Sequence, residues 1–258
     1  MNLRPFVRAA SVLAAIALWQ LVASRHVDAH FINFGNVPAP TDVAHATWTF
    51  LQSPKVFHHF KNSILRVFTG FGTAAVIGIG LGVAVGRSKR IEDIVLPTLE
   101  TLRPIPAVAW IPLAILMFPT TEGSILFITF IGALFPIVLN TIHGIEALDP
   151  RLVLASRSLG AKTWSVLREI ILPGALPSIV TGLRLGMGAS WLCLVTAEMI
   201  AGQYGIGYYT WESYNLQRYP DIVVGMFFIG VFGMVSSALI NRLGLWLMPW
   251  YRPSEGTT

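Results

Sequence analysis

Long apolar runs separated by short polar segments are the feature that most constrains the fold of this chain. A helix needs about 20 mostly apolar residues to cross the hydrocarbon core of a membrane. The stretches that meet this requirement are residues 6–24, 63–86, 99–118, 123–142, 176–202 and 222–243. The sequence therefore predicts an all-α integral membrane protein with six transmembrane helices and both termini on one side.

Composition supports lipid as the main solvent of the chain. Only 12% of the residues are charged and 54% are hydrophobic, whereas soluble domains carry about 25% charged residues. The net charge of +5 does not indicate nucleic-acid binding, because the cations are spread between apolar runs. A single cysteine, Cys193, excludes a disulfide framework and a multi-cysteine metal site. Its apolar surroundings predict a buried structural thiol.

The distribution of Lys and Arg predicts the orientation in the membrane. With the N-terminus inside, eleven of the 18 Lys and Arg residues lie in inside segments, five lie outside, and Arg103 and Arg184 remain within spans. Cytoplasmic loops carry the excess of positive charge. We therefore expect cytoplasmic termini, a periplasmic segment 25–62, a core 63–250 with a cytoplasmic loop 143–175, and a flexible tail 251–258.

The N-terminal region leaves one alternative open. The run 6–24 predicts a retained N-terminal transmembrane helix, residues 1–24, but the basic start and Val22-Ala23-Ser24 also suit a cleaved signal peptide. Beyond it, Thr41 and Asp42 are plausible caps of a short amphipathic helix over 43–52. His58-His59 has no third ligand at a suitable spacing, which favours a solvated outer loop over a metal site.

Glycines in the second apolar run predict close helix packing. Gly78, Gly82 and Gly86 recur at intervals of four, with Gly80 between them. Small residues at this spacing let helices approach closely in lipid. The chain contains no phosphate-binding G-x-x-x-x-G-K-[ST] sequence, so it does not bind ATP through a Walker loop of its own.

The loop 143–175 is unusually basic and helix-prone. Asp149-Pro150 predicts a helix start, and Gly160 suits a left-handed stop. Thr163 is expected to cap a second helix, which Pro173 is expected to terminate. Two short helices with apolar and basic surfaces could dock on another protein, or could lie on anionic lipid. The residues alone leave these two alternatives open.

The same loop resembles the cytoplasmic signature of ATP-binding-cassette (ABC) importer permeases. That signature is E-A-A, three residues, Gly, nine residues, Ile, one residue, Leu-Pro. The positions in register are Ala155, Gly160, Ile170, Leu172 and Pro173, while Leu154 and Ser156 replace the usual Glu and Ala. Residues 102–118, Phe135-Pro-Ile-Val-Leu-Asn140-Thr, Ala197-Glu198-Met and Gly205-Ile-Gly207 resemble the nitrate/sulfonate/taurine branch.

The resemblance implies a fold and a function. The fold would be the type I ABC importer permease fold, and the chain would be a non-catalytic subunit in a bacterial inner membrane. Implied partners are a second permease copy forming a homodimer, two ATPases that bind ATP and Mg, and a periplasmic or lipid-anchored binding protein. The cargo would be an aliphatic sulfonate, taurine or nitrate, or alternatively bicarbonate or a pyrimidine or thiamine precursor. A stand-alone secondary transporter is disfavoured, because no inverted repeat is evident.

Polar residues inside the apolar runs are candidates for the translocation pathway, because such residues are costly in lipid. The candidates are Arg103, Trp110, Asn140, Arg184 and Glu198. Each has a structural alternative. Arg103 could pair with Glu100 or extend to the inner surface, as could Arg184. Asn140 could bridge helices, and Glu198 could hold a helix junction.

Overall fold

The structure is a computed structural model that describes residues 4–25 and 36–250, and these residues form helices joined by short turns. In chain order the segments are α1 (Arg4–Ser24), α2 (Pro40–Gln52), α3 (Val56–Arg87), α4 (Lys89–Leu102), the 3₁₀ turn η1 (Ala107–Trp110), α5 (Ile111–Met117), α6 (Thr121–Glu146), α7 (Pro150–Ser158), α8 (Thr163–Val166), the π-helical turn η2 (Leu167–Ile171), α9 (Leu172–Ala201), α10 (Ile206–Asn215) and α11 (Tyr219–Leu247). The tail expected at 251–258 lies outside the described residues.

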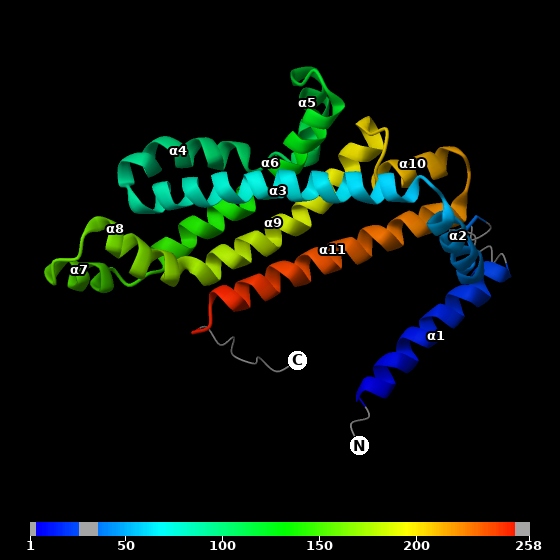
Figure 1. The fold of residues 1–258 in the computed structure, drawn as a ribbon, viewed down its shortest axis with the longest axis horizontal. Coiled ribbons are helices and arrows are strands. Elements are labelled where there is room, and N and C mark those ends of the chain that lie inside the picture. The colour runs from blue at the N-terminus through cyan, green and yellow to red at the C-terminus, as the bar shows by residue number, and fades with distance from the viewer. Residues whose placement is uncertain (1–3, 26–35, 251–258) are drawn as a thin grey trace.

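Five helical stretches are long and apolar enough to cross a membrane, which confirms the all-α membrane fold. They are Phe6–Ser24, Val56–Arg87, Thr121–Glu146, Thr163–Ala201 and Tyr219–Leu247. Figure 1 shows α3, α6, α9 and α11 as an elongated bundle, with α7 and α8 at one end. The helix α1 stands apart from this bundle and contacts α2.

The third predicted span is not the continuous helix that its apolar run suggested. The chain forms α4, turns at residues 103–106, and continues through η1 into the short α5; the two helical parts are bent by 87°. Pro104 and Pro106 lie in the turn and cannot donate backbone hydrogen bonds, which explains the break. In Figure 1, α4 follows α3 and α5 then projects away from the bundle. The pair counts as a sixth span only if it crosses as a broken helix.

Three helices form the centre of the bundle. Val67 on α3, Ile128 and Ile137 on α6, and Met187 and Leu194 on α9 are all buried in one apolar cluster. Cys193 belongs to the same cluster, which confirms the predicted buried thiol.

The glycine stripe of α3 packs on α6, as predicted. A Cβ atom added to Gly82 would lie 2.5 Å from Cβ of Thr141, and one added to Gly78 would lie 2.9 Å from Ile137. Gly86 faces Ile145 at 3.1 Å in the same way. Gly80 has no atom within 4 Å of such a Cβ and is not part of the packing face.

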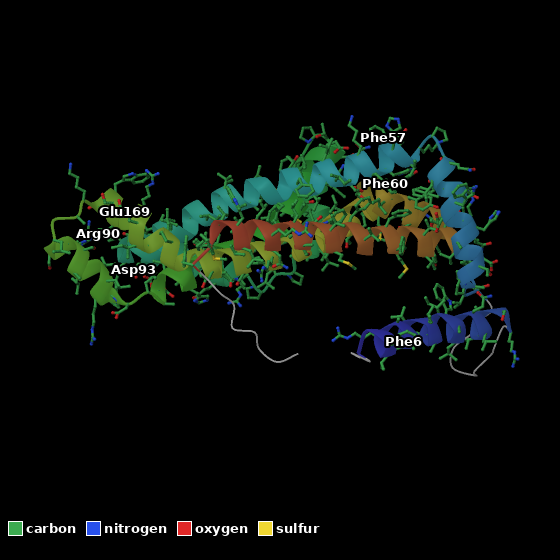
Figure 2. The ribbon with its side chains drawn as sticks, turned by 60° about the horizontal axis from the view of Figure 1, so that its bottom comes forward. Phe6, Phe57, Phe60, Arg90, Asp93 and Glu169 are labelled. Atoms are coloured by element: carbon green, nitrogen blue, oxygen red, sulfur yellow. The ribbon has the colours of Figure 1, made fainter. Side chains whose placement is uncertain are left out.

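Two details near the N-terminal end differ from expectation. The helix α2 begins at Pro40 rather than near residue 43, and Asp42 accepts a hydrogen bond from the backbone of Ala39 at 3.4 Å instead of capping from outside. His59 lies within α3 and is buried, not solvated in a loop. Figure 2 shows the neighbouring Phe57 and Phe60 of α3 at this end of the bundle, whereas Arg90 and Asp93 of α4 and Glu169 of η2 lie at the other end.

Candidate functional site

Three parts of the structure contain most of the candidate functional residues: the α7–α8 turn at one end of the bundle, a cavity between α6 and α9, and a buried polar cluster near the opposite end.

The helix α7 begins and ends where the sequence predicted. The Asp149 carboxylate accepts a hydrogen bond from the backbone N–H of Arg151 at 2.9 Å, and Pro150 is the first helical residue. Gly160 has a φ of +85°, as expected for a left-handed stop. Backbone bonds from Ala161 to Ser156 at 3.1 Å and from Gly160 to Arg157 at 2.9 Å complete a Schellman motif.

The second helix of the loop does not end at Pro173. The residues from Thr163 to Ala201 form one continuous helical stretch, and Lys162 rather than Thr163 stands at its N-cap position. The π-helical turn η2 immediately precedes Pro173, with the Leu172 N–H bonded to the Leu167 carbonyl. A widened turn can accommodate the proline ring and its missing N–H without breaking the helix. The loop is therefore joined rigidly to α9.

The loop presents a set of large apolar side chains to its surroundings. The exposed ones are Leu152, Leu154, Leu159 and Trp164. The signature residues Ala155 and Gly160 are also exposed, Ser156 is half-buried and donates to the Val153 carbonyl at 2.8 Å, and Ile170, Leu172 and Pro173 are half-buried toward the bundle. The first part of the signature thus forms a surface, and the last part anchors that surface to the spans.

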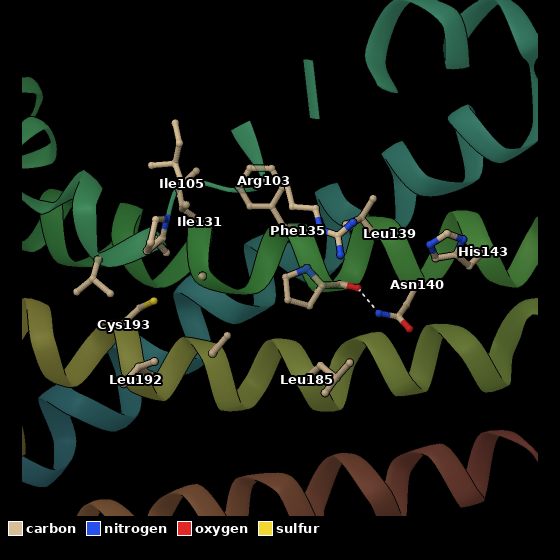
Figure 3. Close-up of a pocket in the computed structure, with 16 residues that line it drawn as sticks. Arg103, Ile105, Ile131, Phe135, Leu139, Asn140, His143, Leu185, Leu192 and Cys193 are labelled. Atoms are coloured by element: carbon tan, nitrogen blue, oxygen red, sulfur yellow. Dashed lines mark hydrogen bonds between the residues drawn. The ribbon is translucent and has the colours of Figure 1, made fainter. Parts of the chain in front are cut away.

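A cavity of about 600 Å³ lies beside α6 and α9, under the turn that breaks the third span. Arg103 and Asn140, two of the predicted pathway residues, line it. Figure 3 shows Arg103 reaching from the turn toward α6, beside Phe135 and Leu139. Within the described part of the chain Arg103 forms no ion pair with Glu100 or any other carboxylate. The Asn140 side chain donates to the Pro136 carbonyl at 2.8 Å.

The structure does not bring all the predicted pathway residues together. Arg184 is exposed on α9 and does not line this cavity. Trp110 packs against the central cluster, and its indole N–H has no hydrogen-bond partner among the described residues. His143, which sequence reasoning did not select, lines the cavity and lies 3.6 Å from the Glu146 carboxylate.

Glu198 lies in the buried polar cluster instead. Its carboxylate is wholly buried and accepts hydrogen bonds from Ser63 at 2.8 Å, from Arg66 at 2.9 Å and from the backbone of Gly207 at 3.0 Å. Arg66 also pairs with Glu122 at the start of α6. The cluster therefore joins α3, α6, α9 and α10.

His59 extends this cluster to the turn before α10. Its Nδ1 atom lies 2.9 Å from the carbonyl oxygen of Gly205, a residue with a φ of +132°. On α10, burial raises the pKa of the Tyr209 phenol above its usual range, and its ring stacks on Phe50 of α2 at 4.2 Å.

Sequence reasoning missed the cluster although one signal was present. Arg66 stands inside the apolar run 63–86, although the count of cations by side includes it among the five that lie outside. Its partners are distant in sequence, since 132 positions separate it from Glu198. An arginine inside a span predicts an acidic partner on another span, and Glu198 is such a residue.

The signature in the loop, the set of long apolar helices and a match to a known family now agree. Residues 74–253 match the family described as "binding-protein-dependent transport system inner membrane component". The chain belongs to this family. As a family member it is a multi-pass membrane permease, and its relatives are transport permeases.

Two relatives illustrate the similarity of this permease to other transport permeases. The nitrate import permease protein NrtB of Synechocystis sp. is 33% identical over 93% of this chain and 88% of its own length. The putative aliphatic sulfonates transport permease protein SsuC of Escherichia coli is 35% identical over 94% of this chain and 92% of its own length. The resemblance to the nitrate/sulfonate branch is thereby confirmed.

A solved structure shows the same fold. A chain of the methionine ABC transporter MetNI, in inward-facing conformations, aligns with a TM-score of 0.62 at 18% identity, covering 76% of this permease and 96% of that chain. At this identity the likeness shows the fold alone, and it confirms the type I importer architecture.

Proposed function

We propose that this chain is the transmembrane permease subunit of an ATP-driven importer that moves a small anion into the cytoplasm. The observation that carries the proposal is the exposed apolar turn between α7 and α8, which leads directly into one unbroken helical stretch from α8 through η2 to the end of α9. The names of the relatives, which transport nitrate and aliphatic sulfonates, support an anion as cargo.

In this function the coupling element is the C-terminal part of α7 with the turn that leads to α8, residues 154–162, here called the α7 turn. Leu154 and Leu159 insert into a cleft of a separate ATPase subunit, and the Schellman turn at Gly160 fixes the direction in which the two helices leave that contact. Because no break separates α8 from α9, movement of the ATPase is transmitted directly to a central helix of the bundle. Two ATPases bind ATP and Mg, and this chain performs no chemistry itself.

The arrangement requires further partners. A second copy of the permease forms the other wall of the pathway, and a binding protein outside delivers the anion. The α7 turn faces the cytoplasm together with both termini, which agrees with the excess of Lys and Arg on that side. ATP shifts the population between inward- and outward-open states, and the anion contributes only its difference in affinity between them.

The proposal is tested by the composition and activity of the purified complex. Affinity purification of the wild-type chain should yield an ATPase in constant ratio, and anion-loaded binding protein should stimulate its ATP hydrolysis. Replacing Leu154 and Leu159 together by Asp should remove the ATPase while the permease remains in the membrane. An ATPase that stays bound to this double variant would place the contact elsewhere.

A further inference from the structure

The cavity between α6 and α9 has walls that are mostly apolar. On α6, Ile131, Phe135 and Leu139 recur every four residues and therefore share one face of the helix. Leu185 and Leu192 of α9 form the opposite wall. The helix breaks at residues 103–106, and this turn carries the chain across the top of the groove, as Figure 3 shows.

Polar groups converge on the cavity from one side. Arg103 carries the positive charge, Asn140 supplies an amide, and His143 supplies an imidazole one turn further along α6. No Asp or Glu is among the residues that line this cavity in the described structure. The carboxylate of Glu146 lies outside this lining and contacts His143 rather than Arg103.

Arg103 is exposed at this apolar groove and has no carboxylate partner among the described residues, which favours an anionic occupant. The planar guanidinium of an arginine matches the geometry of oxyanions and can donate two parallel hydrogen bonds. Arg66 differs from Arg103, since it is buried and bound by two carboxylates.

We propose that this cavity is a transit site for an organic oxyanion, whose charged group is held by Arg103 and whose apolar part lies against Phe135, Leu139 and Leu185. The inference rests on the proposed function and extends it by assigning a binding site within the permease. Asn140 and His143 are the polar groups that orient the oxyanion beside Arg103. An alkylsulfonate has the required combination of charged head and apolar tail.

The size of the cavity argues for an organic anion over a bare inorganic one. The cavity volume of about 600 Å³ is many times the roughly 30 Å³ that one water occupies in the liquid. A nitrate ion would occupy a small part of this space and would make no use of the apolar walls. Pockets for small organic ligands fall in the same size range and have the same apolar character.

Labelling of an introduced cysteine tests the site directly on the full-length permease. Cys193 is the only cysteine in the sequence, so Cys193→Ala provides a cysteine-free background. Leu192→Cys in that background places a thiol on an exposed wall residue of the cavity. The permease in lipid nanodiscs is treated with a methanethiosulfonate reagent bearing an ethylsulfonate group, and separately with the matching reagent bearing a trimethylammonium group.

We expect Arg103→Gln to slow labelling of the introduced thiol by the sulfonate reagent, relative to labelling by the cationic reagent, by roughly threefold or more, because an attracting charge is lost. Arg90→Gln removes the same charge from the other end of α4, away from the cavity, and should leave the ratio unchanged. Free ethanesulfonate should protect the thiol at lower concentration than nitrate. An unchanged ratio in Arg103→Gln, or protection by nitrate alone, would overturn the proposal.

Transport separates this inference from the proposed function. In vesicles containing the permease, its ATPase and its binding protein, Arg103→Gln should reduce anion uptake at least severalfold while stimulated ATP hydrolysis persists. If the variant transports as well as the wild type, the transit site is wrong and the importer stands. If the wild-type complex shows neither anion uptake nor stimulated hydrolysis, the proposed function fails, and the labelling experiment still decides whether the cavity binds organic anions.

Discussion

Arg66 donates a hydrogen bond of 2.9 Å to the carboxylate of Glu198, across 132 positions of the sequence, and both side chains are buried. The same guanidinium pairs with Glu122 on α6. One arginine on α3 thus holds together the start of α6 and the far end of α9. In an apolar membrane bundle such a cluster fixes the relative position of three spans.

Removing Arg66 should destabilise the permease strongly. Arg66→Met leaves the Glu198 carboxylate buried without its cation, and breaking a buried pair in this way costs about 3–5 kcal/mol. Glu122→Gln should cost much less, because 60% of the Glu122 side chain is exposed. Thermal unfolding of the purified variants provides the measurement. Equal losses of stability in the two variants would contradict the conclusion that the Arg66–Glu198 pair contributes most to the stability of the cluster.

The contact between α3 and α6 makes opposite predictions for two nearby glycines. Gly82→Ala places a Cβ atom 2.5 Å from Cβ of Thr141, and overpacking of this kind costs about 1–3 kcal/mol. Gly80→Ala meets no atom within 4 Å and should be neutral or stabilising, since alanine favours the helix by about 0.5–1 kcal/mol. The comparison is made by melting temperature, and a reversed order would place the packing face on the wrong side of α3.

Gly160 should be required for coupling through its backbone conformation. A Cβ atom added at Gly160 meets no neighbour. A loss of activity in Gly160→Val therefore arises from the backbone φ of +85° rather than from crowding. We expect transport and permease-stimulated ATP hydrolysis to collapse while membrane insertion survives. Gly160→Asn should retain much more activity, because asparagine tolerates this conformation. Normal stimulation in the valine variant would show that the bend is not needed.

The contact of Leu154 with the ATPase should be apolar. Leu154 is 64% exposed and stands where the family signature usually has a glutamate. Leu154→Ala should therefore weaken assembly to a similar extent at low and high salt, because ionic screening does not act on apolar contacts. Assembly is measured by co-purification over a salt series. If Leu154→Ala assembles normally while Arg157→Ala does not assemble, the contact surface has been misplaced.

Local patterns in the sequence predicted most of the helices and the loop correctly. The apolar runs gave five continuous spans, and Asp149, Pro150 and Gly160 gave the bounds of α7, because each of these signals acts on neighbouring backbone groups. Prolines were harder to interpret. Pro104 and Pro106 lie in a break that the apolar run did not suggest, whereas Pro173 is absorbed by a π-helical turn.

Local sequence patterns do not predict the contacts between residues that are distant in the chain. His59 was expected in a solvated loop, but it is buried against Gly205, 146 positions later. Arg103 and Asn140 are predicted pathway residues because polar side chains are costly in lipid, and only the structure places both at one cavity with His143. Which polar side chains meet depends on the packing of α3, α6 and α9, and no local pattern specifies that packing.

Uptake by reconstituted vesicles tests the central claim most directly. Vesicles that contain this permease, the co-purifying ATPase and the binding protein are loaded with ATP on the ATPase side and supplied in turn with nitrate, bicarbonate and ethanesulfonate. We expect accumulation of at least one of these anions against its gradient. This accumulation should be lost when ATP or the binding protein is left out, or when Gly160→Val disrupts the turn. Accumulation that needs no ATP, or the absence of accumulation of all three anions, would contradict the proposed function.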